Sequence, residues 1–271
     1  MSLKIESVRY GENNVYSAYV VYPERAKLPL PSVVVLQEAW GVDAHIEDIT
    51  RRFAEAGYVA FAPDIYARNG ERPAPLTKER TAEVLKFFNA LPPGKAMDPE
   101  AQKAGFASKT PEETARIQES QQTIFGGLGK PEHMDPVLAG TAFLRDSFAP
   151  SKGRKVGVVG FCMGGGLASQ TASRDSRLAI AISLYGRGLD DAAAATVSCP
   201  IVSFCGSDDA HIAGGIPAFA ETMEKHGKKF RSVVYENCGH AFFNDARPSY
   251  DVDAARDAFV QILTEFRKYL V

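Results

Sequence analysis

Residues 156–166, with the sequence VGVVGFCMGGG, constrain the fold of this chain more than any other feature. The apolar and small residues at its start predict a buried strand, and a cysteine between two glycines follows directly. Residues 167–172 then predict the start of a helix. A strand, a G-x-C-x-G turn and a helix form a nucleophile elbow, here with cysteine in place of the commoner serine.

The turn around Cys162 is expected to be tight, because Gly160 and Gly164 occupy positions that admit little beyond a hydrogen atom. The backbone at Cys162 would then be strained, and its sulfur would project at the N-terminus of the following helix. Such a position lowers the pKa of a thiol and offers backbone N–H groups to a developing oxyanion. A small buried cysteine in an ordinary strand–helix turn is the alternative interpretation.

Strand patterns alternate with helix patterns along most of the chain. Strands are expected at 15–22, 33–36, 58–63, 156–159, 178–186, 200–206 and 229–235, and helices at 44–56, 135–148, 216–226 and 251–270. This alternation predicts an α/β fold with a doubly wound, mostly parallel sheet. The length of 271 residues fits one domain over residues 1–271.

The alternation stops between residues 69 and 132, where prolines divide the chain into pieces. Two pieces, 78–91 and 111–126, have helical character. A long stretch without strands inside a compact domain is often a lid or a binding insert. We therefore expect a helical insert here, either a lid or a surface excursion.

Composition and charge limit the classes of binding partner that the chain can have. The net charge is −2, so there is no basic footprint for nucleic acid or anionic membranes. No apolar run approaches the ~20 residues of a membrane span, and the first residues lack a signal-peptide core. The four cysteines have no C-x-x-C spacing, which favours a reduced, cytoplasmic setting. No histidine or acidic cluster has metal-ligand spacing, and we expect neither a metal nor a cofactor.

Four chemically distinctive side chains each follow a different expected strand: Glu38, Cys162, Asp209 and His240. The carboxyl ends of parallel strands meet at one edge of the sheet, where ligands bind in such folds. The order nucleophile, acid, histidine is that of a known catalytic triad. A thiol needs a base such as imidazole, and the imidazole needs a carboxylate to fix its tautomer.

Several assignments stay open on these grounds. Asp208 competes with Asp209 for the acid, and His211 is a weaker rival of His240 for the base. Glu38 either caps the next helix or holds and receives the proton of the thiol. The backbone N–H groups of Ala39 and Met163 are the candidate donors of an oxyanion hole.

With these residues assembled, the chain resembles the dienelactone hydrolase (carboxymethylenebutenolidase) family of the α/β-hydrolase superfamily. The matching stretches are QEAWG at 37–41, APDIYAR at 62–68, GVVGFCMGG at 157–165, GSDD at 206–209 and GHAF at 239–242. They span nearly the whole chain apart from the insert. The acid of the family follows a G-x-x-D pattern, which selects Asp209 over Asp208.

The resemblance implies hydrolysis of a small ester or enol-lactone through a thioester. Carried over to this sequence, it makes Cys162 the nucleophile, His240 the base, Asp209 the group that orients the base, and Glu38 the activator of the thiol. Substrate binding would shift the glutamate to take the proton of the thiol. Water would then deacylate the thioester with help from the histidine.

The chain departs from the family at the groups that bind the carboxylate of dienelactone. The family uses two arginines, one of them four residues after the histidine, where this chain has Asn244. The candidate substrate-binding residues are therefore Trp40, Arg80 and Arg247. This departure makes a related lactone or small ester as plausible a substrate as dienelactone.

Two other classes of function compete with a hydrolase. One is a non-catalytic ligand-binding or regulatory protein that retains the fold, and the intact set of acidic, thiol and imidazole groups argues against it. The other is a thiol redox sensor, which would need a second cysteine placed to resolve a sulfenate.

Overall fold

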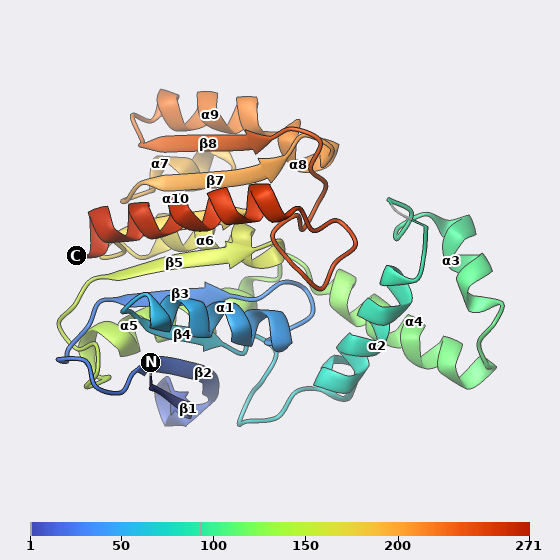
Figure 1. Ribbon diagram of the computed structural model, residues 1–271, viewed down its shortest axis with the longest axis horizontal. Helices are drawn as coiled ribbons and strands as arrows, with labels where there is room; N and C mark the ends of the chain where they lie inside the picture. Colours follow the sequence, from blue (N-terminus) through green and yellow to red (C-terminus); the bar gives the residue numbers. More distant parts are fainter. Residues whose placement is uncertain (1, 93) are drawn as a thin grey trace.

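The protein is described by a computed structural model that covers residues 2–92 and 94–271. An eight-stranded sheet lies at its centre, with helices on both faces (Figure 1). The strands are β1 (Leu3–Tyr10), β2 (Tyr16–Pro23), β3 (Ser32–Leu36), β4 (Val59–Pro63), β5 (Val156–Phe161), β6 (Ile180–Leu184), β7 (Ile201–Gly206) and β8 (Phe230–Tyr235).

The helices are α1 (Ala44–Glu55), α2 (Lys78–Asn89), α3 (Pro99–Phe106), α4 (Pro111–Gly126), α5 (Met134–Asp146), α6 (Met163–Arg174), α7 (Asp191–Ala195), α8 (Ala210–Ala213), α9 (Ile216–Lys225) and α10 (Val252–Leu270). Three short 3-10 turns complete the elements: η1 (Glu12–Asn14), η2 (Ala74–Leu76) and η3 (Pro131–His133). Most of these elements lie where the hydrophobic periodicity predicts them.

The strands follow the order β1-β2-β4-β3-β5-β6-β7-β8. From β4 to β8 all neighbours are parallel, whereas β1 and β2 pair antiparallel and β2 pairs antiparallel with β4. The central pair β3 and β5 aligns Ser32 with Val156 and Leu36 with Gly160, so the two strands end level with each other. The expected α/β fold with a doubly wound, mostly parallel sheet is confirmed.

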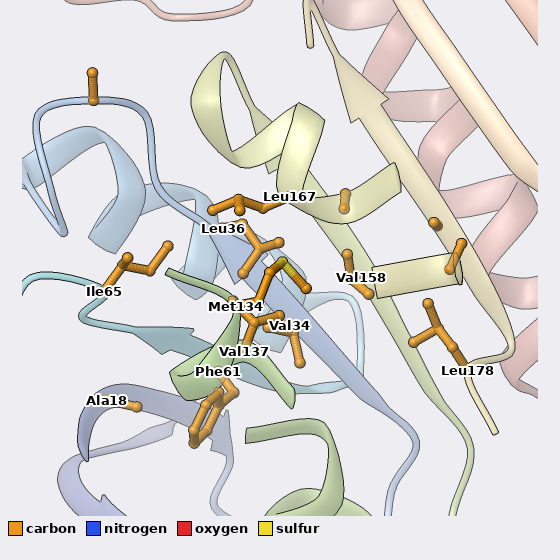
Figure 2. Packing of buried hydrophobic residues seen from close by; sticks show 14 of the residues in the cluster. Ala18, Val34, Leu36, Phe61, Ile65, Met134, Val137, Val158, Leu167 and Leu178 are labelled. Carbon is orange, nitrogen blue, oxygen red and sulfur yellow. The ribbon is translucent and has the colours of Figure 1, made fainter. Parts of the chain in front are cut away.

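Helices α1 and α10 cover one face of the sheet, and α5, α6 and α9 cover the other (Figure 1). The apolar stripe of α1, formed by Ile46, Ile49 and Phe53, is fully buried against the first face. On the second face, Figure 2 shows Met134 beside Val34 and Leu36. Each such side chain contributes about 1.5–3 kcal/mol by leaving water, so the two layers fix the sheet from both sides.

The elements that were not predicted from the sequence include β1, α3, the short helices α7 and α8, and the 3-10 turns. Strand β1 lies at an edge and is mostly exposed or half-buried, and its charged residues Lys4, Glu6 and Arg9 hide any apolar run. Helix α3 has no buried residue and lies among prolines. Both elements are too weakly apolar to give a periodic signal.

The expected helical insert consists of α2, α3 and α4, which project beyond the carboxyl edge of the parallel strands (Figure 1). Its helices hold one another: Phe87 stacks on Phe106 at 4.2 Å between ring centroids, and Arg116 donates to both carboxylate oxygens of Glu83 at 2.8 and 2.6 Å. The insert contacts the rest of the protein through an aromatic pair, in which the ring of Phe88 in α2 packs edge-on against Trp40. The insert is therefore seated on the segment that follows β3.

The turn between β5 and α6 is as tight as its glycines predict. A Cβ atom on Gly160 would lie 1.9 Å from the carbonyl oxygen of Gly164. A Cβ atom on Gly164 would lie 2.4 Å from the carbonyl oxygen of Leu36, so the first turn of α6 rests directly on the end of β3. A Cβ atom on Gly166, two residues further along α6, would have no neighbour outside its own helix nearer than 3.8 Å.

This difference predicts opposite effects for two alanine substitutions in one helix. Gly164→Ala should lower the free energy of unfolding by at least about 2 kcal/mol, because backbone atoms must move apart to admit the methyl group. Gly166→Ala should raise it by roughly 0.5–1 kcal/mol through the lost flexibility of glycine in a helix. Urea denaturation measures both values, and equal effects would contradict the described contact.

Candidate active site

Cys162 lies between β5 and α6 with φ +53° and ψ −114°, a conformation that side-chain-bearing residues rarely adopt. Its N–H donates to the carbonyl of Leu184 at 3.0 Å, and its own carbonyl accepts from Gly165 at 3.0 Å. The residue is half-buried. Such strain costs about 1–3 kcal/mol and persists only where the surroundings enforce it. Here the adjoining strand and helix do so, and they present the sulfur at the start of α6.

His240 and Asp209 meet at the carboxyl ends of β8 and β7. The imidazole Nδ1–H of His240 donates to Oδ2 of Asp209 at 2.6 Å, and the carboxylate is only 9% exposed. Asp208 instead accepts a hydrogen bond from the adjacent Ser207 at 3.2 Å and is exposed. His211 is exposed and lines a separate pocket. The geometry therefore pairs the imidazole with Asp209.

Burial alone would lower the pKa of His240, but hydrogen bonds to Asp209 and to the Cys162 sulfur raise this pKa to about 10. The negative charges of the same two groups act in the same direction. The ring stays 42% exposed at one edge, so it is open to a ligand. An imidazole with this pKa is protonated at neutral pH.

Glu38 follows β3 and is buried, with both carboxylate oxygens engaged. The hydroxyl of Tyr185 donates to Oε1 at 3.1 Å, and the side-chain amide of Asn244 donates to Oε2 at 2.9 Å. Burial and the charge of Glu38 raise the pKa of Tyr185 well above its usual value, so its hydroxyl remains a donor. Among the hydrogen bonds of the described residues, none joins Glu38 to the thiol of Cys162.

Ala39 lies in the segment after β3, and Met163 is the first residue of α6. In residues 2–92 and 94–271, neither backbone N–H has a recorded acceptor. Tyr66 contacts both residues, because its hydroxyl donates to the carbonyl of Ala39 at 2.8 Å and lies 4.0 Å from the sulfur of Met163. Backbone N–H groups without an acceptor can donate hydrogen bonds to a developing oxyanion and stabilise its charge.

The candidate substrate-binding residues separate into two groups. The guanidinium of Arg247 lies 5.7 Å over the ring of Trp40, and its buried Nε and Nη1 atoms have no hydrogen-bond partner within the described ranges. Arg80 is bound inside the insert, where it donates to the Ser120 hydroxyl at 3.0 Å and to the carbonyl of Arg116 at 2.6 Å. Arg80 thus joins α2 to α4.

Two residues of this cluster were missed in the sequence. Tyr185 directly follows β6 with φ +40°, donates to Glu38, and places its ring centroid 5.1 Å from that of His240. The rule that polar residues at carboxyl ends of strands converge could have found it. Tyr66 lies beyond β4 within a matching stretch of the family pattern, but no spacing indicates that its hydroxyl reaches Ala39.

Residues 2–92 and 94–271 contain neither a metal-binding cluster nor a membrane-spanning helix. No group of three or more histidine, cysteine, aspartate or glutamate side chains is arranged to hold a metal ion. No helix in this part of the chain is both long and apolar enough to cross a membrane.

Comparison with known proteins gives a consistent result. The model of the dienelactone hydrolase family matches residues 16–270. A protein of Saccharolobus solfataricus, provisionally named a carboxymethylenebutenolidase, is 31% identical over 253 residues, which cover 93% of each chain. A protein of Methylorubrum extorquens with the same provisional name is 29% identical and covers 95% of this chain and 78% of its own.

Solved structures share the fold at lower identity. A dienelactone hydrolase-like promiscuous phosphotriesterase, P91, from metagenomic libraries has a TM-score of 0.67 at 17% identity, with complete coverage of both chains. A dienelactone hydrolase from Anabaena variabilis has a TM-score of 0.56 at 15% identity, also with complete coverage of both chains. At these identities the likeness establishes the architecture alone.

The paired carboxylate and imidazole predict a selective effect on titration. In Asp209→Asn the pKa of His240, followed by NMR of its ring, should fall from about 10 toward 6.5, because the hydrogen bond and charge that raise it are weakened. Asp208→Asn is the matched control and should leave the pKa nearly unchanged. An equal drop in both variants would contradict the pairing.

The raised pKa of His240 also makes the free energy of unfolding depend on pH. A folded-state pKa above that of the unfolded chain stabilises the fold fully below about pH 6.5, and the contribution is lost as the pH rises through about 10. Unfolding measured between pH 6 and 10 should therefore show a smaller decline in Asp209→Asn than in the wild type. A decline of the same size would mean that this ion pair does not set the pH dependence.

Proposed function

The chain belongs to the dienelactone hydrolase family, and we propose that it is a cysteine-dependent hydrolase that cleaves a small ester or lactone through a thioester acyl-enzyme. The observation that supports this most directly is the short hydrogen bond between His240 and Asp209 at the edge that also presents Cys162. A protonated imidazole, its carboxylate and a strained thiol at a helix N-terminus are the groups that acyl transfer needs.

The proposed reaction begins with attack of the Cys162 thiolate on the ester carbonyl carbon. The electron pair of the carbonyl moves onto its oxygen, which the N–H groups of Ala39 and Met163 stabilise. Collapse of this intermediate breaks the ester C–O bond, and His240 gives a proton to the leaving alkoxide. Water, deprotonated by His240, then attacks the thioester carbonyl, and breaking of the C–S bond releases the carboxylic acid and the Cys162 thiolate, which recovers its proton from Glu38.

Glu38 is proposed to receive the proton of the thiol. In the described arrangement its two oxygens accept from the neutral donors Tyr185 and Asn244, at 3.1 and 2.9 Å. Neutral donors leave the negative charge of the carboxylate without a paired cation, so a proton from the thiol would relieve an expensive burial of charge. A movement of the side chain toward the sulfur would make this transfer possible.

Trp40 and Arg247 are proposed as one wall of the substrate site. The unpaired buried nitrogens of Arg247 are available to an oxygen of the substrate, and Trp40 offers an apolar surface below them. Trp40 also packs edge-on against Phe88 and Phe125 of the insert, at 5.9 and 6.2 Å between centroids. The insert thus lies next to this wall, which supports its role as a lid.

The chemistry of the other cysteines disfavours a redox sensor. All four cysteines are free thiols. Cys199, Cys205 and Cys238 are buried, and burial raises the pKa of Cys199 to about 12 and of Cys205 to about 11. Thiols of this kind react slowly and are poor partners for a sulfenate.

Removal of the nucleophile gives the direct test. Cys162→Ala should abolish hydrolysis of 4-nitrophenyl acetate, a loss of at least about a thousandfold in kcat/KM as seen when nucleophilic catalysis is removed. Cys199→Ala, which removes a buried thiol elsewhere, should keep most of the activity. Wild-type turnover by Cys162→Ala would exclude the assignment.

A further inference from the structure

A pocket of about 220 Å³ lies between the segment after β6 and helices α8 and α9. Gly186, Arg187 and Gly188 form one side, and the other side is formed by His211, Ile212, Gly215, Ile216 and Phe219. None of these residues has a part in the chemistry proposed above. The pocket is nevertheless formed at the carboxyl ends of β6 and β7, the edge that presents the catalytic candidates.

Short connections join the pocket to the active-site residues. Gly186 follows Tyr185, whose ring packs against His240, and a Cβ atom on Gly186 would lie 2.4 Å from the carbonyl carbon of Gly165 in α6. His211 follows Asp209 by two residues. The lining of the pocket therefore contacts the first turn of α6 through Gly186 and continues into the acid loop through His211.

The lining of the pocket combines an apolar floor with the guanidinium of Arg187 and the imidazole of His211. Ile212, Ile216 and Phe219 are buried, whereas Arg187 and His211 are exposed at the rim. No ion pair or side-chain hydrogen bond of Arg187 or His211 occurs in the part of the chain that the structure describes. Arg177, by comparison, is held by both oxygens of Asp146 at 3.1 and 2.8 Å.

We propose that this pocket is a second substrate subsite that takes a short apolar arm ending in a carboxylate. The apolar floor would cover the methylene or aryl part of the arm, and the guanidinium of Arg187 would bind the two oxygens side by side. The volume lies below the roughly 300–1,000 Å³ of pockets that enclose a whole ligand, so it fits one arm of the substrate. This proposal rests on the proposed function, because the arm belongs to the ester being cleaved.

Two pairs of esters test the subsite from either side of the bond that is cleaved. Mono-4-nitrophenyl adipate and 4-nitrophenyl hexanoate differ by a carboxylate at the end of the acyl chain. 4-Acetoxybenzoate and its methyl ester differ by a carboxylate on the leaving group. For each pair the readout is the charge preference, defined as kcat/KM for the charged ester divided by that for the neutral one.

In at least one pair, Arg187→Gln should lower the charge preference about tenfold, the effect of one solvent-exposed charge-assisted hydrogen bond pair. Arg187→Lys should retain part of the preference because the positive charge remains. Arg174→Gln is the matched control, since it removes an exposed arginine of α6, and it should leave the charge preference unchanged. A charge preference in Arg187→Gln equal to that of the wild type in both pairs would overturn the proposal.

Binding separates a failure of the subsite from a failure of the proposed function. Calorimetric titration of the Cys162→Ala variant with monomethyl adipate and dimethyl adipate needs no turnover. The monoanion should bind at least about fivefold more tightly than the diester, and adding Arg187→Gln should remove the difference. Adding Arg247→Gln instead should leave the Arg187-dependent difference in place. Equal binding of the two adipates would reject the subsite even if esters are hydrolysed, and absence of thiol-dependent turnover would reject the hydrolase even if the monoanion binds.

Discussion

The site depends on a contact between two pieces of backbone, the first turn of α6 and the end of β3. Gly164 lies so close to the carbonyl oxygens of Leu36 and Gln37 that no side chain fits between them. This contact fixes the start of α6, and with it the strained turn that presents the sulfur, against the end of β3.

A second constraint is the buried charge that follows β3. The carboxylate of Glu38 lies inside the protein with only the phenol of Tyr185 and the amide of Asn244 as partners. Burial of a carboxylate without a cation is costly, and fully satisfied hydrogen bonds are what makes it tolerable. The same carboxylate is the proposed acceptor of the thiol proton, so the feature that costs stability serves the proposed chemistry.

The sequence predicted well the features that follow from the geometry of a parallel sheet. It predicted poorly the features that depend on the partners of individual side chains. The alternation of apolar runs predicted the parallel strands, and their shared edge predicted that Glu38, Cys162 and His240 come together. The choice of Asp209 over Asp208 needed the family pattern, because adjacent residues at a strand end differ only in direction. The partners of Arg80 lie on another helix of the insert, an arrangement that no spacing in the sequence shows.

Mass spectrometry of a trapped intermediate tests the central claim most directly. In a His240→Asn variant, deacylation should slow because water lacks its base. After brief exposure to 4-nitrophenyl acetate, the intact protein should gain the mass of one acetyl group, and peptide mapping should place it on the sulfur of Cys162. Acetylation at another residue, or a variant that turns over the ester with no acyl group on the sulfur, would contradict the account.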